Sequence, residues 1–126
     1  MRINDRVREI IELNLREYFI PLIVQSDHPR VFPIYFARII EENRVAIPVT
    51  DATGIEEMLD KEVPAMAVVA DRPGGFEAYV LQGRASRVTD SDDYQFVQAM
   101  RNEVPGFPIH GAVVFEVDSA NPVPPP

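Results

Sequence analysis

The apolar residues of this chain are divided into many short runs, and this division constrains its fold more than any other feature. The longest candidate for a membrane segment, residues 18–24, stops at Gln25 after seven residues. A membrane-spanning helix needs about 18 consecutive apolar residues, so we expect no membrane partner. Short runs of β-branched and aromatic residues between turn clusters are instead typical of a small domain rich in β-strands.

The composition narrows the function classes further. The chain has 126 residues, the size of one domain, and 46% of them are apolar. It contains no cysteine, which excludes disulfides, thiolate metal sites and cysteine nucleophiles. Twelve basic and 20 acidic side chains give a net charge of −8, which argues against nucleic-acid binding. The polar start of the chain lacks the apolar stretch of a secretory signal, so we expect a cytoplasmic protein.

Helical periodicity predicts an N-terminal helix over about residues 4–18. Asn4 is suited to cap it, because a short polar side chain can accept a hydrogen bond from the first turn. A second helix is predicted from a capping box, Thr53 with Glu56, to about residue 62, and a third over residues 91–104. The predicted helices have apolar residues on one face, as in the first of them: Ile3, Val7, Ile11, Leu15 and Tyr18.

Six strands are predicted between and after these helices, over residues 19–25, 30–40, 44–50, 64–71, 76–88 and 112–118. Gly83 predicts a bulge or bend in the long fifth strand. Pro48 cannot donate a ladder hydrogen bond, which places it at an edge, a bulge or a strand end. We expect one domain over residues 1–118 and a polyproline-like tail over residues 119–126.

The order of these elements, together with residues 43–50 (NRVAIPVT), 63–71 and 79–85 (YVLQGRA), resembles the pyridoxamine 5′-phosphate oxidase-like superfamily, and within it the small FMN-binding proteins. The resemblance covers about residues 10–118. It implies a mainly β fold with flanking helices, a six-stranded antiparallel split β-barrel of the FMN-binding type. It also implies a homodimer with FMN at the interface between subunits, acting as a flavin-dependent oxidoreductase or electron carrier.

The resemblance also implies which residues contact the cofactor. Arg30 stands where the family places a basic phosphate ligand, at the start of the second strand, and Tyr35 stands where many members place a flavin contact. A solvated arginine and a packed tyrosine are the alternative interpretations. The third strand would offer backbone groups to the flavin ring and then lead into the phosphate-binding segment, through Pro48, Val49, Thr50, Asp51, Ala52 and Thr53.

The phosphate segment is also where this sequence departs from the family. The expected lysine is replaced by Gly54, and residues 51–62 carry five carboxylates against one lysine, Lys61. A phosphate group would lose its main cation there. A divergent split-barrel dimer without flavin, serving as a binding or structural module, is therefore an alternative. A third hypothesis is that the same cleft binds another flat ligand such as haem, with His28 or His110 as its axial ligand.

No residue is assigned a catalytic role from the sequence. His28 and His110 lack partners at metal-ligand spacing, so no metal site is predicted. Asp92 and Asp93 are better explained as partners of a helix dipole than as a catalytic pair. The apolar run over residues 31–40 reads as a strand buried on both faces, which would agree with a dimer.

Overall fold

The predicted N-terminal helix is present in the computed structural model, which describes residues 3–25, 27–35, 37–49, 61–89, 91–99, 109 and 111–124. Helix α1 (Asp5–Glu17) follows Asn4, whose side chain accepts a hydrogen bond from the Val7 amide at 2.8 Å. That bond satisfies one of the otherwise unpaired N–H groups of the first turn. The buried side chains of α1 all lie on one face: Val7, Ile10, Ile11 and Leu15.

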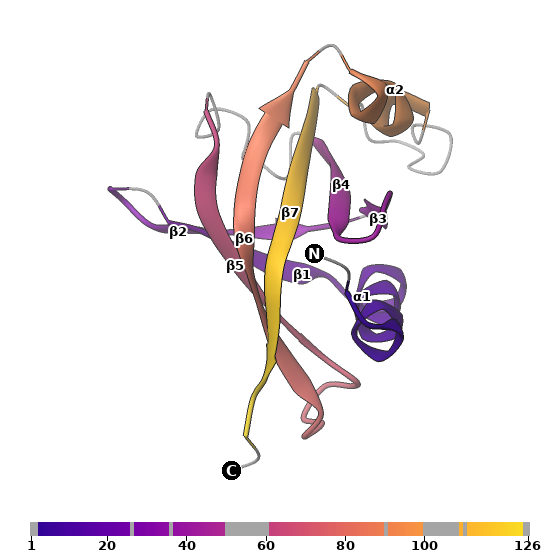
Figure 1. Cartoon of the computed structure of the whole chain (residues 1–126), viewed down its shortest axis with the longest axis vertical. Coiled ribbons are helices and arrows are strands. Elements are labelled where there is room, and N and C mark those ends of the chain that lie inside the picture. The colour runs from indigo at the N-terminus through magenta and orange to yellow at the C-terminus, as the bar shows by residue number, and fades with distance from the viewer. Residues whose placement is uncertain are drawn as a thin grey trace.

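One antiparallel sheet contains all the strands that the structure describes. Its strands are β1 (Ile20–Val24), β2 (Arg30–Ile34), β3 (Arg38–Ile39), β4 (Arg44–Val49), β5 (Val63–Ala70), β6 (Ala78–Val88) and β7 (Gly111–Pro122), in the order β2-β1-β5-β6-β7-β4-β3. β2 and β3 form its two edges, although only residues 35–37 separate them. The four residue-to-residue steps from the end of β2 at Ile34 to the start of β3 at Arg38 span at most about 14 Å. The sheet therefore curls until its edges approach one another (Figure 1).

The prediction of six strands was wrong, because the segment predicted as one strand over residues 30–40 is two. Residues up to Ile34 pair with β1, and β1 begins at Ile20, the partner of Ile34. Beyond that point the chain has no further β1 residue to pair with. Arg38 pairs instead with Ala46 of β4, at the opposite edge of the sheet.

Gly83 marks the predicted irregularity in β6. The register between β6 and β7 shifts between Gln82 and Gly83, and a Cβ at position 83 would lie 1.8 Å from the carbonyl oxygen of Glu116. Only glycine permits so close a backbone approach. β7 also continues past residue 118, because residues 119–122 pair with β6. The boundary predicted for the tail therefore falls within this strand.

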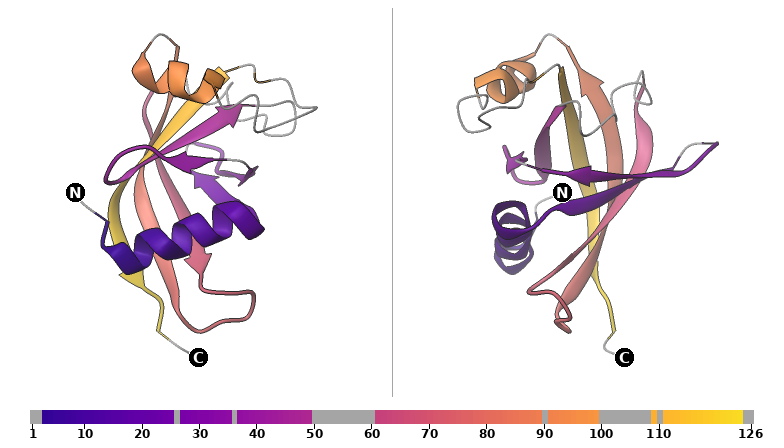
Figure 2. Two further views of the ribbon diagram at one scale, coloured as in Figure 1. Left: turned by 90° about the vertical axis from the view of Figure 1, so that its right-hand side faces the viewer. Right: turned by 180° about the vertical axis from the view of Figure 1, so that it is seen from behind.

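The described helices α1 and α2 pack on different apolar clusters, and both lie on the same side of strands β5 to β7 (Figure 2). α1 packs into the main core, which includes Leu22, Ile47, Leu81 and Val117. α2 (Asp92–Ala99) packs on a smaller cluster that contains Val97, Ala46 and Ala112. Residues 100–104 of the predicted third helix, and the helix predicted after Thr53, lie outside the described residues. Of the helices that the structure describes, none is long and apolar enough to cross a membrane.

Candidate functional site

Arg30, the predicted phosphate ligand, is the first residue of β2 and pairs with Val24 near the tip of the β1–β2 hairpin. Its side chain is exposed, and its guanidinium carbon lies 5.4 Å from the centre of the buried Phe32 ring. An arginine over an aromatic face is held by attraction to the ring. Arg30 is therefore a positioned cation that remains open to a ligand from solution.

Tyr35, the second predicted contact, follows the other end of β2. Its ring packs against Phe19 with centroids 5.5 Å apart and an interplanar angle of 42°. Both rings are accessible, with 39% of Tyr35 and 47% of Phe19 exposed. Five strand residues span roughly 16 Å, so one β2 strand carries Arg30 and Tyr35 at its two ends.

Pro48 and Val49 lie at the end of β4, as the strand-end interpretation of Pro48 predicted, and both are buried. On one side they pair with Ala112 and Gly111 of β7. On the other side, β3 pairs only with Val45 and Ala46. Within the part of the chain that the structure describes, β3 therefore leaves residues 47–49 of β4 without a strand partner on that side, and we call this stretch the open edge of β4.

The remaining predicted contacts continue directly from this open edge. Thr50, Asp51, Ala52 and Thr53, with Gly54, lie outside the described residues. The described part of the site is thus the cation of Arg30, the ring of Tyr35 and the edge of β4.

A single chain does not bring Arg30 and the end of β4 together. The tip of the β1–β2 hairpin points away from the body of the sheet, whereas β4 lies on the opposite side near α2. Both Figure 1 and the right view of Figure 2 show this arrangement. The two elements therefore occupy separate parts of the single chain.

An ion pair fixes α2 beside β4. Arg44, the first residue of β4, bonds both carboxylate oxygens of Asp93 on α2, with Nη1 to Oδ1 at 3.3 Å. Burial lowers the pKa of the Arg44 guanidinium, but the hydrogen bond and charge of Asp93 more than offset this, so the pKa is raised. Asp93 therefore ties α2 to β4 through this ion pair, a contact that the predicted helix-dipole role did not include.

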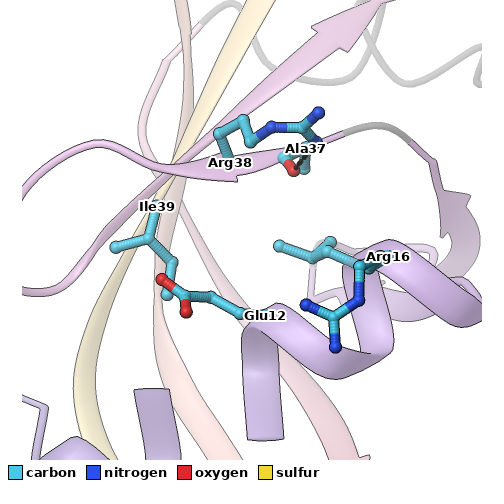
Figure 3. A pocket seen from close by; sticks show the side chains of 6 residues that line it. Glu12, Arg16, Ala37, Arg38 and Ile39 are labelled. Carbon is cyan, nitrogen blue, oxygen red and sulfur yellow. Dashed lines mark hydrogen bonds between the residues drawn. The ribbon is translucent and has the colours of Figure 1, made fainter. Parts of the chain in front are cut away.

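A pocket of about 410 Å³ opens between the end of α1 and the segment leading into β3, and no sequence motif predicted it. Figure 3 shows Glu12 and Arg16 projecting from α1 on one side, with Arg38 and Ile39 on the other. Arg16 and Arg38 are 22 positions apart and belong to no shared motif. Only the tertiary fold brings them to one pocket.

An uncovered apolar face is a second feature that the sequence did not indicate. Outward-facing residues of β2, β1 and β5 form a row in which Val31 pairs with Ile23, and Ile23 pairs with Met66. Val31 is 61% exposed and Val68 44% in the single chain. Burial of residues 31–40 on both faces, which was expected to agree with a dimer, stays a prediction. No outward residue of these three strands is charged: Val31, Pro33, Pro21, Ile23, Pro64, Met66, Val68 and Ala70.

Comparison with known proteins identifies the fold. No family model and no curated protein matches the sequence. Among solved structures, HupZ of Group A Streptococcus is similar at 11% identity, covering 97% of this chain and 94% of HupZ, with a TM-score of 0.77. A candidate pyridoxamine 5′-phosphate oxidase of Lactobacillus delbrueckii is similar at 16% identity, covering 94% and 93% of the two chains, with a TM-score of 0.69.

An FMN-binding protein of Syntrophomonas wolfei is also similar, at 14% identity over 92% of this chain and 82% of that chain, with a TM-score of 0.59. These identities are too low to carry residue roles from one protein to another. The agreement over nearly the whole length concerns the path of the backbone. The chain thus has the fold of the pyridoxamine 5′-phosphate oxidase-like and flavin-binding split-barrel proteins.

Proposed function

We propose that this protein is a homodimeric split-barrel flavoprotein that binds FMN and acts as an oxidoreductase or electron carrier. The observation that carries the proposal is the open edge of β4 at residues 47–49, which leads directly into the segment aligned with the family's phosphate site. Backbone groups on such an edge can bond the polar rim of a flavin ring. Bound FMN would supply the redox chemistry, and the chain's residues would bind and orient it.

The chain offers a cation and an aromatic ring to the same cofactor. Arg30 is exposed and positioned over Phe32, so its guanidinium can bond a phosphate group. Tyr35 is partly exposed beside Phe19, and an aromatic ring can pack on a planar flavin. With the edge of β4, these groups match the two ends of FMN, which are a phosphate and a flat polar ring.

A second copy of the chain is proposed to cover the apolar face of β2, β1 and β5. An antiparallel sheet that faces water normally carries polar residues on that side, and a large exposed apolar patch marks an interaction surface. Because this face is uncharged, two copies can meet there although each chain carries a net charge of −8. The partner would also supply the element missing from each site, since Arg30 and the end of β4 lie apart in one chain.

A divergent dimer without flavin, acting as a binding or structural module, is the second candidate. Gly54 in place of the family's lysine favours it, as do the five carboxylates over residues 51–62. These charges would weaken phosphate binding unless Arg30 of one subunit compensates for them.

The proposal is tested by incubating the purified protein with FMN, desalting it and recording the visible spectrum. We expect retained flavin at one FMN per chain, and a loss of at least about tenfold in affinity for Arg30→Gln, because a charged hydrogen bond to phosphate is removed. Arg72→Gln, in an exposed turn, is the matched control and should bind as the parent does. If the protein is a dimer but neither the parent nor the Gly54→Lys variant retains flavin, the second candidate, a binding or structural module without flavin, is favoured.

A further inference from the structure

We propose that proline residues close the open strand edges of this sheet to other strands, so that a second copy docks on it face to face. The edges concerned are those of β2, β4 and β7, each of which lacks a strand partner on one side within the described residues. The register and the hydrogen bonds that anchor each strand determine which backbone groups face these edges. The face-to-face part rests on the homodimer proposed above, whereas the edge part does not.

The outer edge of β2 presents Val31 and Pro33. Gln25, directly after β1, donates its backbone N–H to the Pro64 carbonyl of β5 at 2.8 Å. Because the backbone groups of successive strand residues face alternate neighbours, the even-numbered residues of β1 face β2. Their partners are the even-numbered residues of β2: Arg30, Phe32 and Ile34. Pro33 therefore faces outward, and it has no N–H to offer an added strand.

Pro48 is the residue that faces outward along the open edge of β4. On the side of β7, the Asn43 carbonyl just before β4 accepts a hydrogen bond from the Val117 N–H at 2.8 Å. On the opposite side, the Arg44 carbonyl accepts one from the Ile40 N–H at 2.9 Å. Even-numbered residues of β4 thus face away from β7. Pro48 offers a carbonyl group there without an N–H, so a small ligand can donate to it but a strand cannot pair with it fully.

The end of β7 repeats this arrangement. The register with β4 ends at Glu116, whereas β7 continues beside β6 to Pro122. Val123 donates its N–H to the Ala78 carbonyl of β6 at 2.9 Å, so the odd-numbered residues at this end face β6. The outward residues are therefore Ala120 and Pro122. Pro122 again removes the donor that an added strand would need.

Two further positions are closed in other ways. β3 is only two residues long, and so short an edge gives an added strand little to pair with. On β5, the pairing with β1 ends at Ala67, and beyond it the Ala70 carbonyl accepts a hydrogen bond from Asn14 Nδ2 of α1 at 2.7 Å. With these edges closed, the apolar face of β2, β1 and β5 is the surface that suits a second copy.

Restoring the missing N–H groups tests the proposal. Pro33→Val and Pro122→Val each complete an open edge, and valine favours strands. In sedimentation velocity, each variant should form species larger than the parent's at protein concentrations at least about tenfold lower than the parent requires. Pro64→Val is the matched control, because Pro64 is also exposed but its carbonyl already bonds Gln25 between β1 and β5. It should keep the parent's mass.

Amide exchange followed by NMR identifies which edge pairs. In the parent, the amides of Val31 and Ala120 face open edges, so they should exchange at least about tenfold faster than the Phe32 amide, which faces β1. In the Pro33→Val species, the Val31 amide should become protected. This change separates strand pairing from nonspecific association of an apolar surface.

Two results would overturn the proposal. One is that both edge variants keep the parent's mass, and the other is a Val31 amide that is already protected in the parent, because its edge would then be paired. The variants are compared with the parent's own mass, so FMN binding does not affect the result. A parent of single-chain mass would overturn the face-to-face part together with the proposed dimer, and the variants would still decide the edge part.

Discussion

The outer surface of the sheet has two halves of opposite chemistry. Over β2, β1 and β5 it is apolar and uncharged, and Val31 and Val68 are exposed there. Toward β7 it is charged, because Arg84 of β6 bonds three carboxylates, Glu62 at 3.0 Å, Asp118 at 3.2 Å and Glu116 at 3.3 Å. The hydrogen bond to Asp118, with the charges of all three carboxylates, raises the pKa of Arg84.

The contrast indicates that the charged half contributes to the stability of the chain and the apolar half to its assembly. The charged half satisfies its own groups and is stable in water. The apolar half has no such network and gains free energy only when another surface covers it. Substitutions in the apolar half should therefore change assembly, and substitutions in or around the charged half should change the stability of the chain and leave its assembly intact.

The strongest test places charge on the apolar half. In Val31→Asp combined with Val68→Asp, the proposed dimer would bury unpaired carboxylates, each at a cost of several kcal/mol. A two-fold interface contains every substitution twice. We expect the dimer to weaken by at least about 100-fold in sedimentation velocity measurements, with loss of bound FMN. Phe76→Asp removes a side chain that is 67% exposed in the β5–β6 turn, and it should leave the dimer unchanged. A doubly substituted protein that remains dimeric would contradict the assignment.

Gly83→Ala should destabilise the chain where β6 meets β7. The added Cβ would lie 1.8 Å from the Glu116 carbonyl oxygen, so the two strands must separate locally. We expect a loss of about 3 kcal/mol in the free energy of unfolding, measured by urea denaturation. Gly74→Ala is the control, because Gly74 has φ +73° with open space around it, and strain alone there costs about 1–2 kcal/mol. Equal effects of the two variants would refute the close approach.

Asp93→Asn should loosen α2 from β4. The substitution removes a charged partner of Arg44 in a site where the Asp93 side chain is only 17% exposed. We expect a loss of about 1.5 kcal/mol in the free energy of unfolding, with faster amide exchange at Val97, the buried residue of α2. The solution mass should stay that of the parent. Unchanged exchange at Val97 would mean that the ion pair does not hold the helix.

Glu77→Gln should have the smallest effect, and a pH-dependent one. The hydrogen bond from Arg6 lowers the pKa of Glu77 below its ordinary value of 4.5. A carboxylate with a lowered folded-state pKa stabilises the chain above pH 4.5, and this stabilisation is lost as the pH falls through the folded-state value. Thermal unfolding should show a small decrease in Tm for the variant at pH 7 that disappears in acid. A difference that persists at low pH would point to packing as its cause.

Local sequence signals predicted most of the fold. Asn4 indicated the start of α1, Pro48 the end of β4 and Gly83 the bulge in β6. The break between β2 and β3 was not predictable, because the one breaker in residues 30–40, Pro33, lies inside β2. The position of the break is set by where β1 begins. Similarly, residues 119–122 look like a tail until β6 is known to extend beside them.

The site was less predictable than the fold, because it also depends on which strands pair in the folded chain. Arg30 and Tyr35 were identified through resemblance, but their separation along β2 and the open edge of β4 depend on tertiary pairing. The pocket of Arg16 and Arg38 joins residues that no motif connects. Burial of residues 31–40 on both faces stays a prediction for a dimer, because a run of apolar residues looks the same whether its outer side is covered by its own chain or by another.

Size-exclusion chromatography with light scattering and flavin absorbance, after loading with FMN, tests the central claim most directly. We predict one species of twice the chain mass that carries two FMN molecules. A second copy of the chain would cover the apolar half of the sheet and bring its Arg30 to the end of β4 in the first copy. A species of single-chain mass without flavin would contradict the proposed dimer and the proposed cofactor together.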